Sequence, residues 1–219
     1  MPGGGMPGPR PTCLANAMKR STAIGHLVEM AEVASQWLEL GDRRRWPLNE
    51  MWVTGELLSF AETLEAGGVV LVLDLPAEEL PWLAKHPTGE AIGHQLRLGK
   101  RPFLWCYRPR AWPVWTYQHR RVVKFWSVDS GLASSAIEAL RSRRLERLAV
   151  VEPSEDELTT QLRAELAVSH EHLRSVLEGY WDRDWRRRHK GYDEAPEDHL
   201  WRAATAVAEM LDAVGDLKE

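Results

Sequence analysis

The sequence predicts an α/β (α+β) fold, in which a small mixed sheet with flanking helices is followed by an antiparallel hairpin of helices. One observation is a nearly uninterrupted Val/Leu run at 69–75, typical of a strand buried on both faces and therefore of a sheet covered by helices. The other is that strand-like and helical patterns alternate up to Pro153, whereas only helical periodicity follows it. These patterns predict an α/β domain at 18–152 and a helical hairpin at 153–219.

The first 17 residues are dense in glycine and proline and bury little apolar surface, so we expect 1–17 to be a disordered leader, with Met18 as an alternative translation start. The chain shows no apolar core of a secretory signal and no apolar run of membrane-spanning length. Its two cysteines, Cys13 and Cys106, support neither a disulfide framework nor a cysteine metal site. We therefore predict a cytoplasmic protein that does not bind membranes.

In the α/β domain, apolar residues at helical spacing predict a first helix that begins at Ser21 as N-cap and ends before Gly41. Strands are expected at 51–55, 69–75, 103–107, 114–117 and 121–128, with a brief edge strand at 148–151. Further helices are expected at 56–64, 89–98 and 133–147.

In the C-terminal part, Ser154 and Glu157 have the spacing of a capping box, and one apolar helical face continues from there toward Lys190. Pro196 occupies a favourable first position for the last helix. Apolar residues alternating by three and four along that helix predict that it packs antiparallel on its predecessor.

The net charge of −4 gives no global electrostatic case for wrapping nucleic acid or coating an anionic membrane. The distribution is uneven, because residues 1–150 carry a formal charge of +4 and residues 151–219 carry −8. One hypothesis is therefore a structural protein whose complementary halves join within one chain or between the subunits of a homodimer.

Tryptophan is the most unusual component, with 11 residues against 4 tyrosines and 3 phenylalanines. Four of the tryptophans lie between Glu90 and Asp129, an interval without a single carboxylate in which arginine and lysine alternate with aromatic residues. Aromatic faces beside guanidinium groups suit stacking of a base next to a phosphate. The predicted ligand-binding residues are Arg108, Arg110, Trp112, Trp115, Arg120 and Lys124. The alternative is structural, with the aromatic residues in the core and the basic residues covering the sheet or pairing with the acidic hairpin.

Three more tryptophans lie where the hairpin turns, so we expect a structural tip formed by Trp181, Asp182, Trp185, Arg186, His199 and Trp201. The three indoles are expected to cluster there, and Asp182–Arg186 and Asp184–Arg188 have the spacing of helical ion pairs. No histidine pair has the spacing of a zinc helix, so neither a metal site nor a cofactor is predicted.

Catalytic signatures are weak. The sequence lacks a nucleophile elbow, a phosphate-binding Gly-Lys-Ser/Thr loop and a dinucleotide fingerprint. The remaining candidates are Asp74 and Asp129 at predicted strand ends, and His189, whose spacing from Arg183 loosely fits the helical HEPN ribonucleases.

Three strings, at 69–76, 125–131 and 180–185 with 196–201, together resemble an uncharacterised bacterial family, a domain of unknown function, across most of 18–214. The order of strand, glycine, short helix and apolar strand is also similar in layout to small nucleotidyltransferases. That resemblance implies a Gly-Ser turn followed by metal-binding carboxylates, whereas this chain has Gly55-Glu56 and then Gly67 and Val69 at the corresponding positions. The Asp-x-Asp pair that holds the metal in those enzymes is missing.

We therefore expect a non-catalytic, nucleotidyltransferase-like module that binds a nucleotide, another anionic ligand or a protein partner. The alternatives are a divergent metal-dependent nucleotidyltransferase that uses Asp74 and Asp129, and a HEPN-like ribonuclease that uses Arg183 and His189.

Overall fold

The computed structural model describes residues 18–40, 46–65, 67–190 and 195–217. The predicted leader with Cys13, Gly41 after the first predicted helix, and Gly191, where the sequence pattern ends the long helix, lie outside these ranges. No helix in the described part of the chain is long and apolar enough to cross a membrane.

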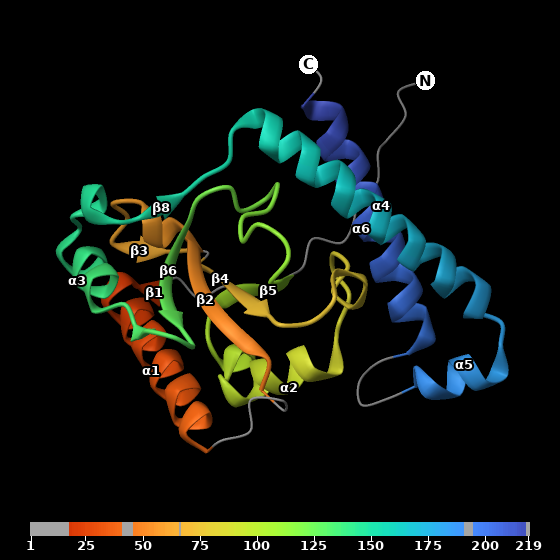
Figure 1. Ribbon diagram of the computed structural model, residues 1–219, viewed down its shortest axis with the longest axis horizontal. Helices are drawn as coiled ribbons and strands as arrows, with labels where there is room; N and C mark the ends of the chain where they lie inside the picture. Colours follow the sequence, from red (N-terminus) through yellow and green to blue (C-terminus); the bar gives the residue numbers. More distant parts are fainter. Residues whose placement is uncertain (1–17, 41–45, 66, 191–194, 218–219) are drawn as a thin grey trace, which may run out of the picture.

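A mixed six-stranded sheet forms the centre of the fold, as predicted (Figure 1). Its strands are β2 (Leu48–Gly55), β4 (Gly67–Leu73), β5 (Phe103–Pro109), β6 (Val122–Ser127), β7 (Gly131–Leu132) and β8 (Val150–Val151). The order is β5-β4-β2-β6-β7, with β8 also paired to β6. Strand β5 pairs parallel to β4, and β2 pairs antiparallel to both β4 and β6, so β4, β5 and β6 all run in the same direction. A separate pair joins β1 (Met18–Lys19) to β3 (Thr63–Leu64).

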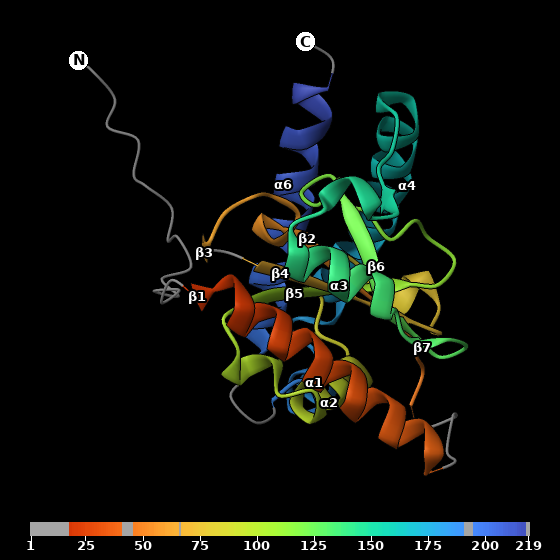
Figure 2. The ribbon, with the colours of Figure 1, turned by 90° about the vertical axis from the view of Figure 1, so that its left-hand side faces the viewer.

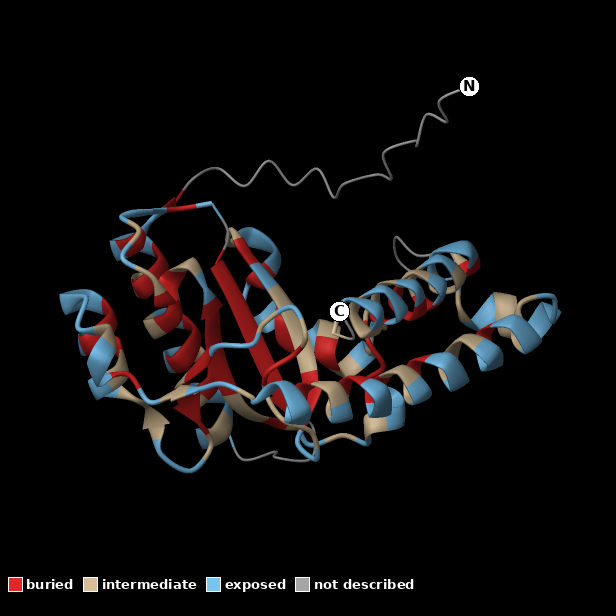
Figure 3. Ribbon diagram, turned by 90° about the horizontal axis from the view of Figure 1, so that it is seen from above, coloured by how far each residue is buried: buried red, intermediate tan, exposed pale blue. Residues whose placement is uncertain are grey.

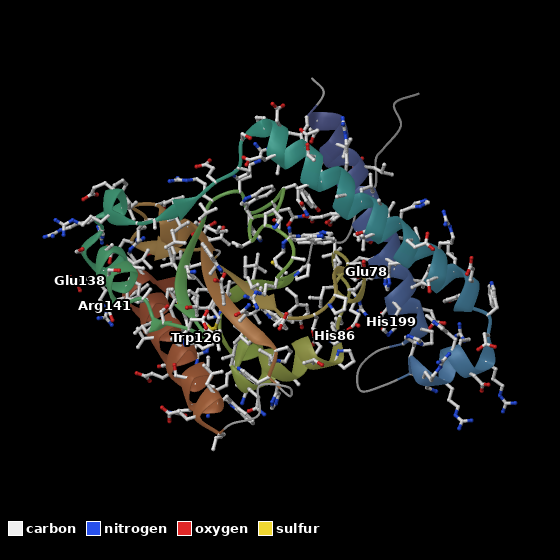
Figure 4. The ribbon with its side chains drawn as sticks, in the orientation of Figure 1. Glu78, His86, Trp126, Glu138, Arg141 and His199 are labelled. Carbon is white, nitrogen blue, oxygen red and sulfur yellow. The ribbon has the colours of Figure 1, made fainter. Side chains whose placement is uncertain are left out.

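One face of the sheet is covered by α1 (Arg20–Glu39), α2 (Pro87–Gln95) and α3 (Ser134–Ser142) (Figure 2). The largest fully buried side chain in this layer is Trp126, which donates a hydrogen bond from Nε1 to Ser35 Oγ at 3.0 Å (Figure 4). Helix α2 approaches β5 closely because Gly89 and Gly93 carry no Cβ, which would lie 2.6 Å from the rings of Tyr107 and Trp105 respectively.

The other face is covered by the 110–121 loop and by α4 (Glu155–Gly179) and α6 (Pro196–Asp216), which pack against each other. The capping box predicted from Ser154 and Glu157 is present at the start of α4. Beyond the sheet, α4 and α6 continue as an arm that ends in the short helix α5 (Arg183–Arg188) (Figures 1 and 3). Figure 3 shows the buried strands lying between helices whose outer surfaces are exposed.

The 114–117 segment is not a strand, contrary to the sequence prediction. It belongs to a loop that crosses the sheet face, where Thr116 and His119 close a turn and Trp115 packs on Trp52 and Val70. The chain takes this course because the burial of Trp115 and a hydrogen bond from Arg108 to the Pro113 carbonyl hold it over the sheet.

Arg20 explains two further differences. Helix α1 starts at this residue, and no side-chain cap comes from Ser21 or from Lys19. The buried Arg20 guanidinium donates hydrogen bonds to the carbonyls of Leu57, Ser59, Ala61 and Leu140. Because three of these carbonyls lie within the predicted 56–64 helix, that segment is reduced to the 3₁₀ helix η1 (Glu56–Leu58) followed by β3.

Two predicted helices are shorter in the structure. The 133–147 helix stops at Ser142, because Arg143 adopts a left-handed conformation with φ of 57°, and the 3₁₀ helix η4 (Leu145–Arg147) follows. The long helix ends at Gly179 rather than near Lys190, because the Trp185 ring packs where a Cβ on Gly179 would lie. The remaining 3₁₀ helices are η2 (Ala77–Glu79) and η3 (Leu98–Lys100).

Candidate functional site

The carboxyl ends of β4, β5 and β6 lie at one edge of the sheet, because the three strands run in the same direction. Each strand is followed within two residues by a charged, exposed side chain: Asp74 after β4, Arg110 after β5 and Asp129 after β6. Asn49, at the start of the antiparallel strand β2, lies at the same edge. The fold thus brings together one predicted ligand-binding residue and two predicted catalytic candidates.

Backbone hydrogen bonds continue the sheet into this edge and fix the positions of these residues. The Asp74 N–H donates to the Pro47 carbonyl at 2.8 Å, and the Arg110 N–H donates to the Leu73 carbonyl at 2.9 Å. The Val128 N–H, next to Asp129, donates to the Asn49 carbonyl at 2.9 Å. The backbone of the residues that carry these charges is therefore held in place by the sheet.

These residues line a cavity of about 150 Å³, which we call the edge pocket. Its lining residues are Leu38, Trp46, Pro47, Leu48, Asn49, Asp74, Arg110, Val128 and Asp129. Trp46 stacks on Trp37 with ring centroids 5.1 Å apart and contributes to an apolar wall. A neighbouring hollow shares Asp74 and Arg110 with the edge pocket. The pocket thus combines two carboxylates, one guanidinium and one amide with an apolar wall.

Arg108 does not join this site, because its guanidinium is bound inside the fold. It forms a two-pronged ion pair with Glu165 of α4, with Nη1–Oε2 and Nη2–Oε1 distances of 2.7 and 2.6 Å. Its Nε donates to the Pro113 carbonyl, and the guanidinium lies 5.2 Å from the centroid of the half-buried Trp112 ring. Arg108 and Glu165 have side chains only 2% and 3% exposed. The pair joins the sheet to the arm, as the structural alternative anticipates.

Other members of the predicted anion-binding set also have partners within the protein. Arg120 pairs with Glu155 at 2.7 Å, and Lys124 pairs with Glu50 at 3.0 Å. Trp115 is buried in the core. Arg110 is the member of the set that is both exposed and without an ion pair inside the described ranges.

The prediction that three tryptophans cluster at the tip of the arm is wrong, because other rings take the place of Trp201. Trp181 and Trp201 are 85% and 58% exposed, whereas Trp185 stacks on His189 with ring centroids 4.0 Å apart. The His189 ring in turn meets His199 of α6 edge to face at 4.8 Å. The Tyr180 ring also contacts the rings of Trp181 and Trp185, with centroids 5.0 and 6.4 Å apart. The aromatic contacts at the tip thus join Tyr180 and the two imidazoles to Trp181 and Trp185 but do not include Trp201, and Figure 4 shows His199 in the arm.

The polar contacts at the tip also differ from those predicted. Arg186 pairs with Glu197 of α6 at 2.6 Å, and the Asp182 carboxylate accepts a hydrogen bond from the Trp185 backbone as the N-cap of α5. For the second predicted pair, the Arg188 Nε lies within hydrogen-bond distance of the Asp184 carbonyl rather than the carboxylate. These contacts attach α5 to α6 and fix its first turn.

The HEPN-like combination of Arg183 and His189 receives no support from the contacts of the two residues. Arg183 is exposed on the first turn of α5, whereas His189 packs between Trp185 and His199, with Nδ1 at 2.8 Å from the Trp185 carbonyl. Nearby, burial lowers the pKa of His172 on α4, and electrostatic interaction with the neighbouring imidazoles of His199 and His189 lowers it further. The histidines therefore belong to the packing of the tip.

The metal site implied by the nucleotidyltransferase resemblance does not fit this chain. Gly67 and Val69, at the positions of the expected carboxylates, are buried, and a Cβ on Gly67 would lie 2.8 Å from the Phe103 ring. Asp74 and Asp129 lie at the opposite edge of the sheet from Gly55. Within the described residues, no group of three or more His, Cys, Asp or Glu side chains could hold a metal ion.

Glu165 and Trp46 are the residues that our sequence reasoning missed. Glu165 had a readable signal, because a carboxylate lies on the apolar face of α4 between Leu162 and Ser169, where only a buried partner would stabilise it. Trp46 had none, since its stacking on Trp37 depends on how α1 meets the start of β2.

The fold and the edge pocket define a mixed α/β protein with a helical arm and a small polar pocket at the sheet edge. Comparison with known families shows that the chain belongs to a family described as a domain of unknown function (DUF7711), whose model matches residues 18–216. This confirms the resemblance to an uncharacterised family. The chain matches none of the curated proteins or solved structures with which it was compared.

Proposed function

We propose that this protein is a non-catalytic binding module whose ligand occupies the edge pocket. The observation that carries the proposal is the convergence of Asp74, Arg110 and Asp129 on one cavity from the ends of three co-directional strands. Ligands of open α/β sheets commonly bind outside the carboxyl ends of the strands, where loops present polar groups on a rigid scaffold.

The charges in the pocket favour a particular ligand chemistry. Arg110 supplies a guanidinium for an anionic group such as a phosphate or carboxylate. The carboxylates of Asp74 and Asp129 and the side-chain amide oxygen of Asn49 accept hydrogen bonds. They therefore favour a ligand that also carries hydroxyl or amino donors. A phosphate ion alone would lie beside two carboxylates without supplying the hydrogen-bond donors that they need. A nucleotide carries both kinds of group and is the ligand class that we propose.

The size of the pocket limits how the ligand binds. Sites for drug-sized ligands enclose roughly 300–1,000 Å³, whereas the edge pocket encloses about 150 Å³. It therefore accommodates one group of the ligand, and the rest would extend over the neighbouring hollow that shares Asp74 and Arg110. We expect an affinity in the micromolar to millimolar range rather than tight binding.

The test is isothermal titration calorimetry with a panel of purine and pyrimidine mono-, di- and triphosphates. Arg110→Glu should weaken binding at least tenfold, and Asp74→Asn should weaken it because the neutral amide is a poorer acceptor. Arg120→Glu is the matched control, since Arg120 is an exposed arginine that pairs with Glu155 away from the pocket. The proposal fails if no nucleotide binds at millimolar concentration, or if Arg110→Glu binds as the wild type does.

A divergent nucleotidyltransferase is the second candidate, because Asp74 and Asp129 line the same pocket. Magnesium is commonly held by one or two carboxylates together with substrate phosphates. Magnesium-dependent consumption of a nucleotide that disappears in Asp74→Ala would favour this enzyme over a binding module.

A further inference from the structure

The two hollows at the sheet edge share only part of their lining, and this division gives the site a direction. Asp74 and Arg110 line both the edge pocket and the neighbouring hollow. Asp129, Asn49 and Trp46 line the edge pocket but not the neighbouring hollow. A ligand that spans both hollows therefore meets Asp74 and Arg110 where they join, and the other three residues at one end.

The charges along this direction decide how a nucleotide lies in the site. Among the lining residues of the two hollows, Arg110 supplies the positive charge, and a guanidinium is a good partner for a phosphate. The part of the edge pocket beyond Arg110 contains the exposed Asp129, whose carboxylate would repel a phosphate. The phosphates are therefore expected over the neighbouring hollow, and the base in the edge pocket.

An acidic and an amide side chain lie next to each other at the base end. The Val128 N–H donates to the Asn49 carbonyl at 2.9 Å, so the end of β6 and the start of β2 bring Asn49 and Asp129 together. Inside the described ranges, no ion pair or hydrogen bond engages the side chain of either residue. The pair thus offers a ligand two carboxylate acceptors beside an amide N–H donor.

Guanine is the nucleobase whose hydrogen-bonding edge matches this pair. Its N1–H and its N2 amino group are neighbouring donors that suit the two oxygens of one carboxylate, and its O6 acceptor lies beside them. Adenine and cytosine place a ring-nitrogen acceptor beside their amino group, and uracil flanks its N3–H with two carbonyl oxygens. An acceptor that faces the Asp129 carboxylate is repelled, which disfavours those three bases.

An unpaired donor in the wall of the pocket is a separate sign of a ligand that carries an acceptor. Trp46 is 6% exposed, and within the part of the chain that the structure describes its Nε1–H has no hydrogen-bond partner. The indole lines the edge pocket and is stacked on Trp37. Because a buried donor is costly to leave unpaired, a base with acceptors on its edge, such as O6 and N7 of guanine, is favoured here.

We infer that the edge pocket is selective for guanine nucleotides. Asp129 accepts hydrogen bonds from N1 and N2 of the base, Asn49 donates to O6, and Arg110 holds the phosphates over the neighbouring hollow. Asp74, which lines both hollows, is left to accept hydrogen bonds from the ribose hydroxyls between them. The inference rests on the proposed binding of nucleotides at this site and adds which base the site takes.

Isothermal titration calorimetry of the full chain with guanosine, inosine and adenosine monophosphates (GMP, IMP and AMP) tests the selectivity. IMP is GMP without the N2 amino group, so it lacks one of the two contacts to Asp129. GMP should bind at least tenfold more tightly than IMP, and IMP more tightly than AMP. Equal binding of the three would overturn guanine selectivity and leave the proposed function standing, whereas no nucleotide binding at all would overturn both.

Asp129→Asn gives a second test, because it should change the preferred base rather than abolish binding. Xanthosine monophosphate (XMP) has a carbonyl oxygen where GMP has its N2 amino group, and the amide of asparagine can donate to that oxygen. The variant should bind XMP at least tenfold more tightly than GMP, the reverse of the wild type. The matched control is Asp156→Asn, an exposed aspartate of α4 outside the pocket, which should keep the wild-type order. A preference for GMP that survives in Asp129→Asn would refute the role given to Asp129.

Discussion

Replacing Glu165 by leucine should destabilise the protein strongly, because Arg108 would then remain buried without its counter-charge. The two side chains are only 2% and 3% exposed, and two short hydrogen bonds of 2.6 and 2.7 Å join them. Leucine fills a similar volume, so the loss reflects the unpaired charge rather than a cavity. Removing one partner of a buried ion pair costs about 3–5 kcal/mol.

This free energy can be measured by urea denaturation followed by circular dichroism. For a chain of this length, 1 kcal/mol shifts the melting temperature by about 2–4 °C, so the melting temperature should fall by about 6–20 °C. The matched control is Glu155→Leu, which removes the exposed partner of Arg120 and should cost no more than about 1 kcal/mol.

The double variant Arg108→Met with Glu165→Leu separates two explanations for the loss. Replacing both members of a buried pair by apolar residues is often neutral or stabilising, so the double variant should recover most of the stability. If Glu165→Leu costs no more than Glu155→Leu, or if the double variant is no more stable than the single one, the reasoning about an unpaired buried charge is wrong.

Three further outcomes are expected. Gly93→Ala should lower the unfolding free energy by about 1–3 kcal/mol, because its Cβ would lie 2.6 Å from the Trp105 ring; a more stable variant, as helix propensity alone predicts, would contradict this. His172 has a folded-state pKa below its unfolded value, so the unfolded chain gains a proton first and stability falls as pH decreases below about 6.5. His172→Gln should flatten this dependence between pH 7 and 5 in denaturation experiments, and equal slopes would exclude the effect. Burial raises the pKa of Cys106 to about 11, so in a Cys13→Ser background a thiol reagent at pH 8 should react far more slowly with the folded than with the unfolded chain.

Elements with a strong local pattern were predictable from the sequence. The Val/Leu run predicted as a strand at 69–75 supplies most of the buried inner strand β4 (Gly67–Leu73), and the capping box at Ser154 starts α4. The last helix begins with Pro196 and packs on α4 as expected. In each case the hydrophobic period and the end signals act over a few residues, so neighbouring residues alone carry the information.

The 103–128 region was harder to predict, because residues of the same type in it pack in different environments. Trp105 and Trp115 both lie in this basic interval, yet one packs beneath α2 and the other lies in a loop over the opposite sheet face. Local propensity favours a strand for both segments. The long-range partners decide which segment becomes a strand. Trp105 packs against α2 and its segment pairs with the sheet, whereas Trp115 packs on Trp52 and Val70 and its segment remains a loop.

The sequence by itself determined the fold class, the main helices and strands, the candidacy of Asp74 and Asp129 as carboxylates at strand ends, and the candidacy of Arg110 as a ligand-binding residue. Only the tertiary structure decided that these three line one pocket and that Arg108 is enclosed by Glu165 instead. The physical reason is that strand order and direction are set by burial and hydrogen bonds between segments far apart in the chain. A residue's neighbours in sequence set its local conformational preference, whereas packing against distant segments decides whether that preference is realised and which residues become its neighbours in space.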